Sequence, residues 1–206
     1  MEDLPKTPRE IIAENIREVD DLPTLLGVAL LTAQGVEFGL YGIASHLSHT
    51  EVGQKDKRFR KLNPETFLRG DISELKVTLG QLVNLWGDLL MIKSSRLTKF
   101  CEDRNLIVHN YRRVYMMNIK GNPSKKDGIK FLQDFVVEST EISQILLGLT
   151  HLMTRAAAIK EGREEEIKFG DKEEANINAY RTHAVKYKIV NSSLEELVEF
   201  FTVNPT

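Results

Sequence analysis

The chain has 206 residues, of which 41% are hydrophobic, and carries 28 Lys and Arg against 30 Asp and Glu. This length suits one domain with an appendage or two small domains, and the hydrophobic content can fill a core. A single cysteine, Cys101, excludes a disulfide framework within the chain. It is typical of a small buried hydrophobe in a reducing compartment, with a reactive thiol as the alternative. The acidic start, Met1 to Pro5, lacks the regions of a secretory signal, so we expect a cytoplasmic protein.

The first two predicted elements are a short helix from Pro8 to Val19 and a long helix from Pro23 to about Ser48. Leu25 to Leu47 is apolar enough to suggest a membrane span, but Glu37 would cost roughly 2.5 to 3.5 kcal/mol inside a bilayer. We therefore expect the core helix of a soluble bundle, with no membrane contact. Within it, Gly35, Gly39 and Gly42 mark a strip that a neighbouring backbone could approach closely.

Glu37 then becomes a buried or interfacial acid that needs a cation, and Arg104 is a possible partner. After the long helix we expect a polar loop from His49 to Leu62. Asn63 and Pro64 have the pattern of a helix start, and a helix from about Ser73 to Leu85 follows.

The next predicted helix runs from about Ser95 to Met117 and ends before Gly121. Its apolar and aromatic residues recur at the one-face spacing of an amphipathic helix: Leu97, Phe100, Cys101, Ile107, Val108, Tyr111, Val114 and Tyr115. The same stripe passes through position 104, where the register asks for a core residue and the sequence has Arg104. A desolvated guanidinium there needs a partner or an anion.

Helical spacing gives this segment a candidate site. Arg104 and Tyr111 lie seven residues apart and nearly superpose, while His109 lies four residues from Asn105 on a neighbouring face. Arg104, Asn105 and His109 could therefore border one groove. The simpler interpretation is a solvated histidine on a helix flank and an ordinary ion pair of Arg104 with Glu102 or Asp103.

The last predicted core helix runs from Ile129 to about Lys160, and no stretch alternates with the period of a strand, so we expect an all-α fold. Beyond Gly162 the composition shifts toward Glu, and we predict helices at Glu173 to Val185 and Ser193 to Phe201. This appendage could dock a partner, cover the site, or simply close the bundle or lengthen a dimer contact.

The run Arg-Asn-Leu-Ile-Val-His-Asn-Tyr, from Arg104 to Tyr111, resembles the signature of HEPN-domain proteins. That signature is an Arg, four to six residues and then a His, often with a polar residue such as Asn105 after the Arg. The version of the motif with a Tyr two residues after the His, as Tyr111 is here, resembles that of the HepT-like toxins. The resemblance covers the short motif and a compatible helical surround, roughly residues 24 to 160.

The resemblance implies an all-helical antiparallel bundle and a dimeric ribonuclease whose two motifs face each other across the dimer interface. Together with the helical pattern and the shift of composition at Gly162, it leads us to expect three parts: an N-terminal helix or arm (1 to 22), a HEPN-like domain (23 to 160) and a helical C-terminal extension (161 to 206). It also implies a nucleotidyltransferase antitoxin as partner, for which Tyr111 could be the modified residue. The extension is longer than these relatives need, so another defence protein is the alternative partner.

Charge is unevenly distributed. Residues 23 to 160 carry 19 basic and 13 acidic side chains, whereas residues 1 to 22 carry 3 and 7 and residues 161 to 206 carry 6 and 10. The motif-bearing part is therefore +6 between flanks of −4 each, a footprint that a polyanion could use. As phosphate contacts we expect the cationic residues of two short runs. They are Lys57, Arg58, Arg60 and Lys61 in the first run and Arg112 and Arg113 in the second.

We therefore expect a metal-independent endoribonuclease of a toxin-antitoxin or antiviral defence system, with no cofactor. His109 would act as general base or acid, because imidazole titrates near neutral pH. Arg104 would bind the scissile phosphate, Asn105 would orient His109 or the phosphate, and Tyr111 would line the site. No metal site is expected, since His46 and His49 lack a local third ligand. The alternative is a catalytically silent helical module that binds protein or RNA.

Overall fold

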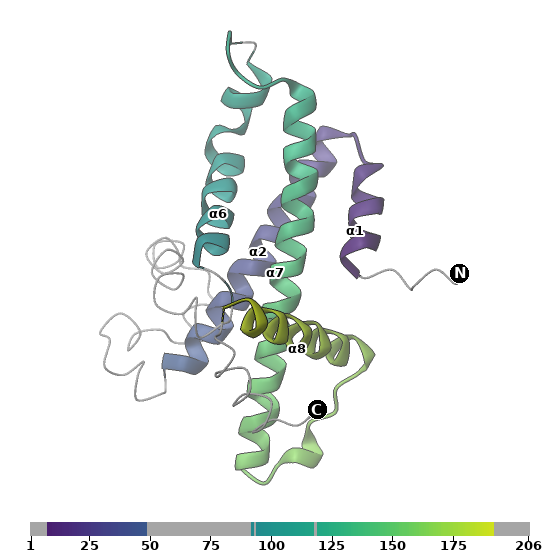
Figure 1. The fold of residues 1–206 in the computed structure, drawn as a ribbon, viewed down its shortest axis with the longest axis vertical. Helices are drawn as coiled ribbons and strands as arrows, with labels where there is room; N and C mark the ends of the chain where they lie inside the picture. The colour runs from purple at the N-terminus through teal and green to yellow at the C-terminus, as the bar shows by residue number, and fades with distance from the viewer. Residues whose placement is uncertain (1–7, 49–91, 93, 118, 192–206) are drawn as a thin grey trace.

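A computed structural model of the chain describes residues 8–48, 92, 94–117 and 119–191. The elements in these ranges are all helical, with no strand, so the expected all-α class is confirmed. Figure 1 shows the main helices, α1 (Pro8–Arg17), α2 (Leu22–Ser48), α6 (Ser94–Asn105), α7 (Lys125–Lys160) and α8 (Asp171–Asn191). Short helical turns η1 (Leu106–Asn110) and η2 (Arg112–Met116) continue α6, and η3 (Glu164–Glu166) precedes α8.

The core lies between α2 and α7, which cross with α2 behind α7 in Figure 1. Buried side chains of α2 repeat every three or four residues, as one face of a helix requires: Leu25, Ala29, Ala33, Val36, Leu40 and Ile43. They meet a matching row on α7, which consists of Leu132, Phe135, Val136, Ile142, Ile145 and Leu146. Of the three glycines expected to allow close approach, Gly39 does so, since a Cβ there would lie 2.9 Å from Leu146 Cβ.

Two further helices, α6 and α1, lie on either side of α7 (Figure 1). Phe100 of α6 stacks on Phe135 of α7 with ring centroids 5.7 Å apart. On α1, Arg9 pairs with Glu141, and Arg96 of α6 pairs with Glu138 and, at 3.1 Å, with Glu141. The N-terminal helix is thus packed against the bundle through α7 rather than standing apart as an arm.

Local chemistry defines both ends of α7. At its start, the Ser124 side chain accepts from the Asp127 amide, and the Asp127 carboxylate accepts from the Ser124 amide at 2.8 Å, which forms a capping box. At its end, Gly162 adopts φ +67°. The amides of Gly162 and Arg163 bond back to the carbonyls of Ile159 and Ala158, so the helix ends in a Schellman turn.

The C-terminal extension packs across the second half of α7, as Figure 1 shows for α8. Gly148 makes this crossing possible, because a Cβ at that position would lie 2.8 Å from Tyr180 Cβ and would overlap the Asn176 carbonyl. Ile177 is fully buried at the contact. Arg155 pairs with Glu174 and lies 4.9 Å from the centroid of the Phe169 ring. Of the roles considered for the extension, closing the bundle matches this packing.

Within the described ranges, two helices are long and apolar enough to cross a membrane by length and composition, Leu22–Ile43 and Lys125–Lys160. Core helices of soluble proteins satisfy the same criterion. In the first helix Glu37 has a cationic partner, as described below, and in the second the cations Lys130 and Arg155 fall within the span.

Several predicted features lie outside the described residues. These are the loop from 49 to 62 with the basic run at Lys57, Arg58, Arg60 and Lys61, the helix start at Asn63, the helix from 73 to 85 and the terminal helix from 193 to 201. They remain predictions.

Candidate functional site

The motif segment has nearly the predicted bounds but a different winding. Residues up to Asn105 form the α-helix α6, while η1 and η2 are π-helical turns, and Tyr111 between them has the α-helical angles φ −53° and ψ −48°. The Met117 amide donates to the carbonyl of Arg112, five residues earlier, at 3.1 Å. π-helical turns are rare overall, but many of those that occur lie at functional sites. They change the direction in which side chains point along a helix.

Arg104, the last basic residue of α6, pairs with Glu37 of α2. The Arg104 Nε donates to Glu37 Oε1 at 2.8 Å, and the two side chains are 27% and 13% exposed. The predicted partnership between these residues is therefore confirmed. The Glu37 carboxylate neutralises the charge of Arg104, which stands where the helical stripe expects a core residue. It also holds the guanidinium at Nε.

Asn105 is exposed and contacts the other edge of the same guanidinium. Its Oδ1 accepts from Arg104 Nη1 at 3.2 Å. The Nη2 group of Arg104 has no hydrogen-bond partner among the described residues. Arg104 thus keeps at least one cationic N–H group for an anion, while Nε and Nη1 fix the plane of the guanidinium.

His109 lies in η1 and is exposed to solvent, as are its neighbours Val108 and Asn110. An exposed imidazole can exchange protons with a ligand. The winding between Arg104 and His109 decides how close the two groups come.

Tyr111 does not line an open site, which corrects the expectation from α-helical spacing. Its side chain is 4% exposed and belongs to the hydrophobic core, and its hydroxyl is buried without a hydrogen-bond partner. Burial raises the pKa of the Tyr111 phenol to about 12. Arg104 and Tyr111 do not superpose, because the π turn intervenes and the two side chains contact different helices, α2 and α7 respectively.

The surface next to His109 combines cations with exposed apolar side chains. Arg112 and Arg113, expected as phosphate contacts, are exposed, and the Arg113 carbonyl accepts from the Asn122 side chain at 3.1 Å. The exposed apolar residues of this end of the molecule are Val108, Met116, Met117 and Ile119, each between 42% and 52% exposed. A surface of this type suits contact with another macromolecule.

Cys101 lies near the site but does not fit a reactive thiol. Its side chain is half-buried, and burial together with the neighbouring Glu37 raises the pKa of the thiol to about 11. The expectation of a small buried hydrophobe agrees with this environment. In the described part of the chain, no group of three or more His, Cys, Asp and Glu side chains lies together as metal ligands would.

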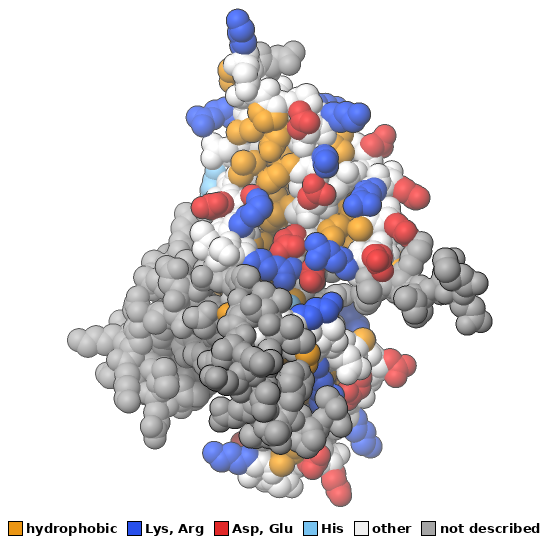
Figure 2. All heavy atoms as spheres, in the orientation of Figure 1, with side chains coloured by type: hydrophobic (Ala, Val, Ile, Leu, Met, Phe, Trp, Pro, Cys, Tyr) orange, Lys and Arg blue, Asp and Glu red, His pale blue; other side chains and the backbone are white. Residues whose placement is uncertain are grey.

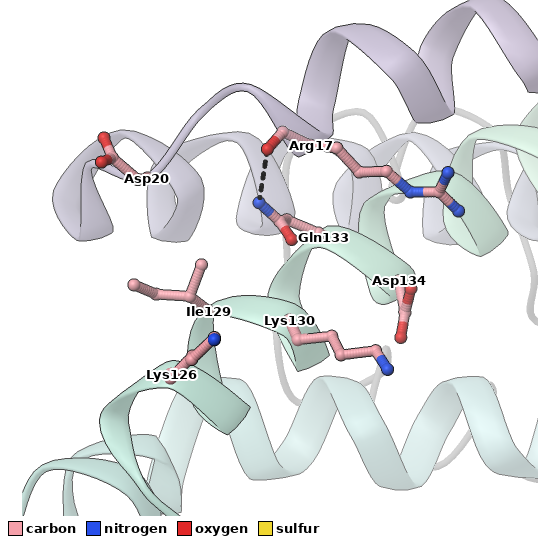
Figure 3. A pocket seen from close by; sticks show the side chains of 7 residues that line it. All are labelled: Arg17, Asp20, Lys126, Ile129, Lys130, Gln133 and Asp134. Carbon is pink, nitrogen blue, oxygen red and sulfur yellow. Dashed lines mark hydrogen bonds between the residues drawn. The ribbon is translucent and has the colours of Figure 1, made fainter.

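Sequence reasoning missed two adjoining pockets on α7. The first, of about 560 Å³, lies beside Arg17 and Asp20 over the first turns of α7, where the Gln133 amide donates to the Arg17 carbonyl (Figure 3). The second, of about 500 Å³, lies between α1 and α6. Figure 2 shows apolar side chains with acids and cations interspersed over this face.

Charges of both signs line these pockets. Arg17 and Asp134 belong to both, whereas Arg104 and His109 belong to neither. The floor of the second pocket contains Phe100, Phe131 and Phe135, which α6 and α7 already use for packing. The pockets therefore offer no chemistry that competes with the motif.

The chain was also compared with known proteins. No family model, no curated protein and no solved structure matches it. The residues and their geometry therefore carry the functional argument.

Proposed function

We propose that the protein is a metal-independent endoribonuclease of the HEPN type, acting in a toxin-antitoxin or antiviral system of the cytoplasm. The observation that carries the proposal is the state of Arg104. Glu37 and Asn105 hold two nitrogens of its guanidinium, the third has no partner in the described part of the chain, and an exposed imidazole follows on the next turn. A fixed cation beside a proton carrier is what phosphodiester cleavage without a metal requires.

The reaction uses the 2′-hydroxyl of the RNA as nucleophile. A base takes its proton, the 2′-oxygen bonds to phosphorus, and the bond from phosphorus to the 5′-oxygen breaks while an acid protonates that oxygen. The products are a 2′,3′-cyclic phosphate and a free 5′-hydroxyl. His109 serves as base or acid, and Arg104 stabilises the charge on the crowded phosphate. Asn105 keeps the guanidinium in its plane.

Each motif supplies one imidazole, that of His109, whereas the reaction needs a base and an acid. A homodimer that brings two motifs together would supply both. The exposed residues Val108, Met116 and Met117 give the motif end of the molecule an apolar surface for this contact. Arg112, Arg113 and the basic run at Lys57, Arg58, Arg60 and Lys61 would hold the RNA backbone.

A second function, a catalytically silent helical module that binds a protein or RNA, is favoured by the same ion pair. An arginine whose charge is matched by Glu37 is also what a purely structural residue would be. A nucleotidyltransferase antitoxin or another defence protein would be the partner in either case. A partner that modifies Tyr111 would first have to expose its hydroxyl.

Incubation of the purified protein with mixed RNA tests the proposal. We expect cleavage that EDTA does not inhibit, with 2′,3′-cyclic phosphate ends, because the proposed site needs no metal. A substrate with 2′-deoxyribose at the scissile position should stay intact, since it lacks the nucleophile. Chelator-sensitive cleavage, or cleavage of the deoxy substrate, would contradict the mechanism.

A further inference from the structure

Arg104 and His109 are five residues apart, and a π turn brings residues at this spacing closer to one face of a helix than an α turn does. In an α-helix, residues five apart are separated by roughly 140° around the axis. In a π-helix, whose hydrogen bonds join residues five apart, two such residues lie about one turn apart and so nearer to one face. Because η1 occupies Leu106–Asn110, we expect its winding to bring His109 nearer to the face of Arg104 than an α-helix would.

Tyr111 stands at the junction of the two π turns and is anchored in the core. Its ring lies 5.0 Å from that of Tyr115, which in turn stacks on Phe131 of α7 at 5.5 Å. A Cβ on Gly128 would lie 2.6 Å from the Tyr111 hydroxyl oxygen and 2.8 Å from Tyr115 Cβ. The absence of a side chain at Gly128 therefore creates the space in which Tyr111 sits.

The hydroxyl oxygen of Tyr111 lies over Gly128, but it is buried and has no hydrogen-bond partner among the described residues. The ring makes the aromatic contact with Tyr115 and belongs to the hydrophobic core. A π turn is rarely the preferred winding of an isolated helix and persists where tertiary contacts hold it. In this segment the contact at the junction is the Tyr111 side chain, whose ring packs on Tyr115 and whose hydroxyl oxygen lies over Gly128.

We infer that Tyr111 is a positioning residue: its buried side chain, packed on Tyr115 and over Gly128, fixes the π winding of η1 and so places His109 beside Arg104. The kinetic consequence rests on the proposed function, whereas the geometric one does not. This role differs from that of a residue lining the site, because it needs the aromatic ring and not the hydroxyl. Tyr111→Phe should therefore preserve the site, and Gly128→Ala should disturb it.

The first measurement is by NMR and needs no RNA. In the full-length protein, nuclear Overhauser contacts between the His109 ring and the Arg104 side chain should be present in the wild type and in Tyr111→Phe. They should be lost in Gly128→Ala, where the added methyl overlaps the Tyr111 hydroxyl oxygen and Tyr115 and so displaces the Tyr111 side chain, and in Tyr111→Ala. Gly27→Ala is the matched control, since a helical Cβ there meets open space. Circular dichroism establishes that each variant is folded.

The second measurement is steady-state cleavage of RNA by the same variants. Tyr111→Phe should keep kcat within about twofold, whereas Gly128→Ala and Tyr111→Ala should lower kcat by roughly 10- to 100-fold with KM nearly unchanged. If Tyr111→Ala fails to fold, Tyr111→Phe and Gly128→Ala still test the inference.

Retention of the His109 to Arg104 contacts in folded Gly128→Ala, or their loss in Tyr111→Phe, would overturn the inference. Wild-type contacts with the expected pattern but no RNA cleavage would uphold the positioning role and contradict the proposed function. Cleavage that Tyr111→Phe abolishes while the contacts persist would mean that the hydroxyl itself acts, and would also overturn the inference.

Discussion

Glu37 is the one charged residue in α2, and it lies where Arg104 of α6 can reach it. A carboxylate at a mostly buried position is costly unless a cation is near, and the guanidinium in the core register has the same need. The pair satisfies both residues at once. It also leaves part of the guanidinium free, which a fully enclosed ion pair would not.

Removal of the Glu37 charge tests this pair. We expect Glu37→Gln to reduce the free energy of unfolding by about 1 to 3 kcal/mol, because Arg104 would keep a partly buried charge without its partner. For a chain of this length that corresponds to a fall in melting temperature of roughly 3 to 8 °C. Calorimetry on the variant, with the exposed acid Glu102→Gln as control, measures it. Equal melting temperatures for the two variants would show that the pair contributes nothing.

The pairing of Glu37 with Arg104 could be predicted from sequence because each charge interrupts an apolar stripe. The inward direction of Tyr111 could not. Its position fits the α-helical stripe equally well whether the tyrosine lines a groove or fills the core, and the space it occupies is created by Gly128, 17 residues later on another helix. The only signal was a glycine within the first turns of a helix, which sequence reasoning passed over.

Helix bounds were predictable where caps and periodicity agree. The predicted start of the second helix at Pro23 and its end at Ser48 match α2 (Leu22–Ser48), and the shift of composition at Gly162 matches the Schellman turn that ends α7. The π winding of η1 and η2 was not predictable. Hydrophobic periodicity over eleven residues does not distinguish the two windings, and the π turns depend on packing against α7.

The contact between α7 and α8 also depends on a glycine. We expect Gly148→Ala to loosen α8, because the methyl would overlap the Asn176 carbonyl and crowd Tyr180. Hydrogen exchange should then show lower protection of residues 171–191, while the amides of α2 stay protected. Gly27→Ala serves as the control, since it adds the same methyl at an open position. Unchanged protection of α8 would mean that the extension docks through other contacts.

For the molecule as a whole, the small net charge conceals an uneven distribution of charge along the chain. The −2 total hides a basic middle between two acidic flanks, and the middle carries the motif. The motif segment of that middle carries the exposed apolar residues Val108, Met116, Met117 and Ile119, and its cations Arg112 and Arg113 are exposed as well. An apolar surface next to cations suits an interface that also admits a polyanion.

We therefore expect a homodimer in solution. Light scattering at micromolar concentration should give about twice the chain mass of 23.5 kDa. Met116→Asp with Val108→Asp should shift the mass toward the monomer, because two charges would be buried in the interface. A monomer that retains full ribonuclease activity would contradict the two-motif site.

Single-turnover cleavage of RNA by point variants tests most directly whether His109 and Arg104 act together in cleavage, as we propose. His109→Ala should lower the rate by roughly 10²- to 10⁴-fold, and Arg104→Ala should do comparable damage through lost charge stabilisation. Asn110→Ala, which alters the exposed neighbour in the same turn, should cleave at nearly the wild-type rate. Full activity in a folded His109→Ala protein would contradict the account and favour the silent interaction module.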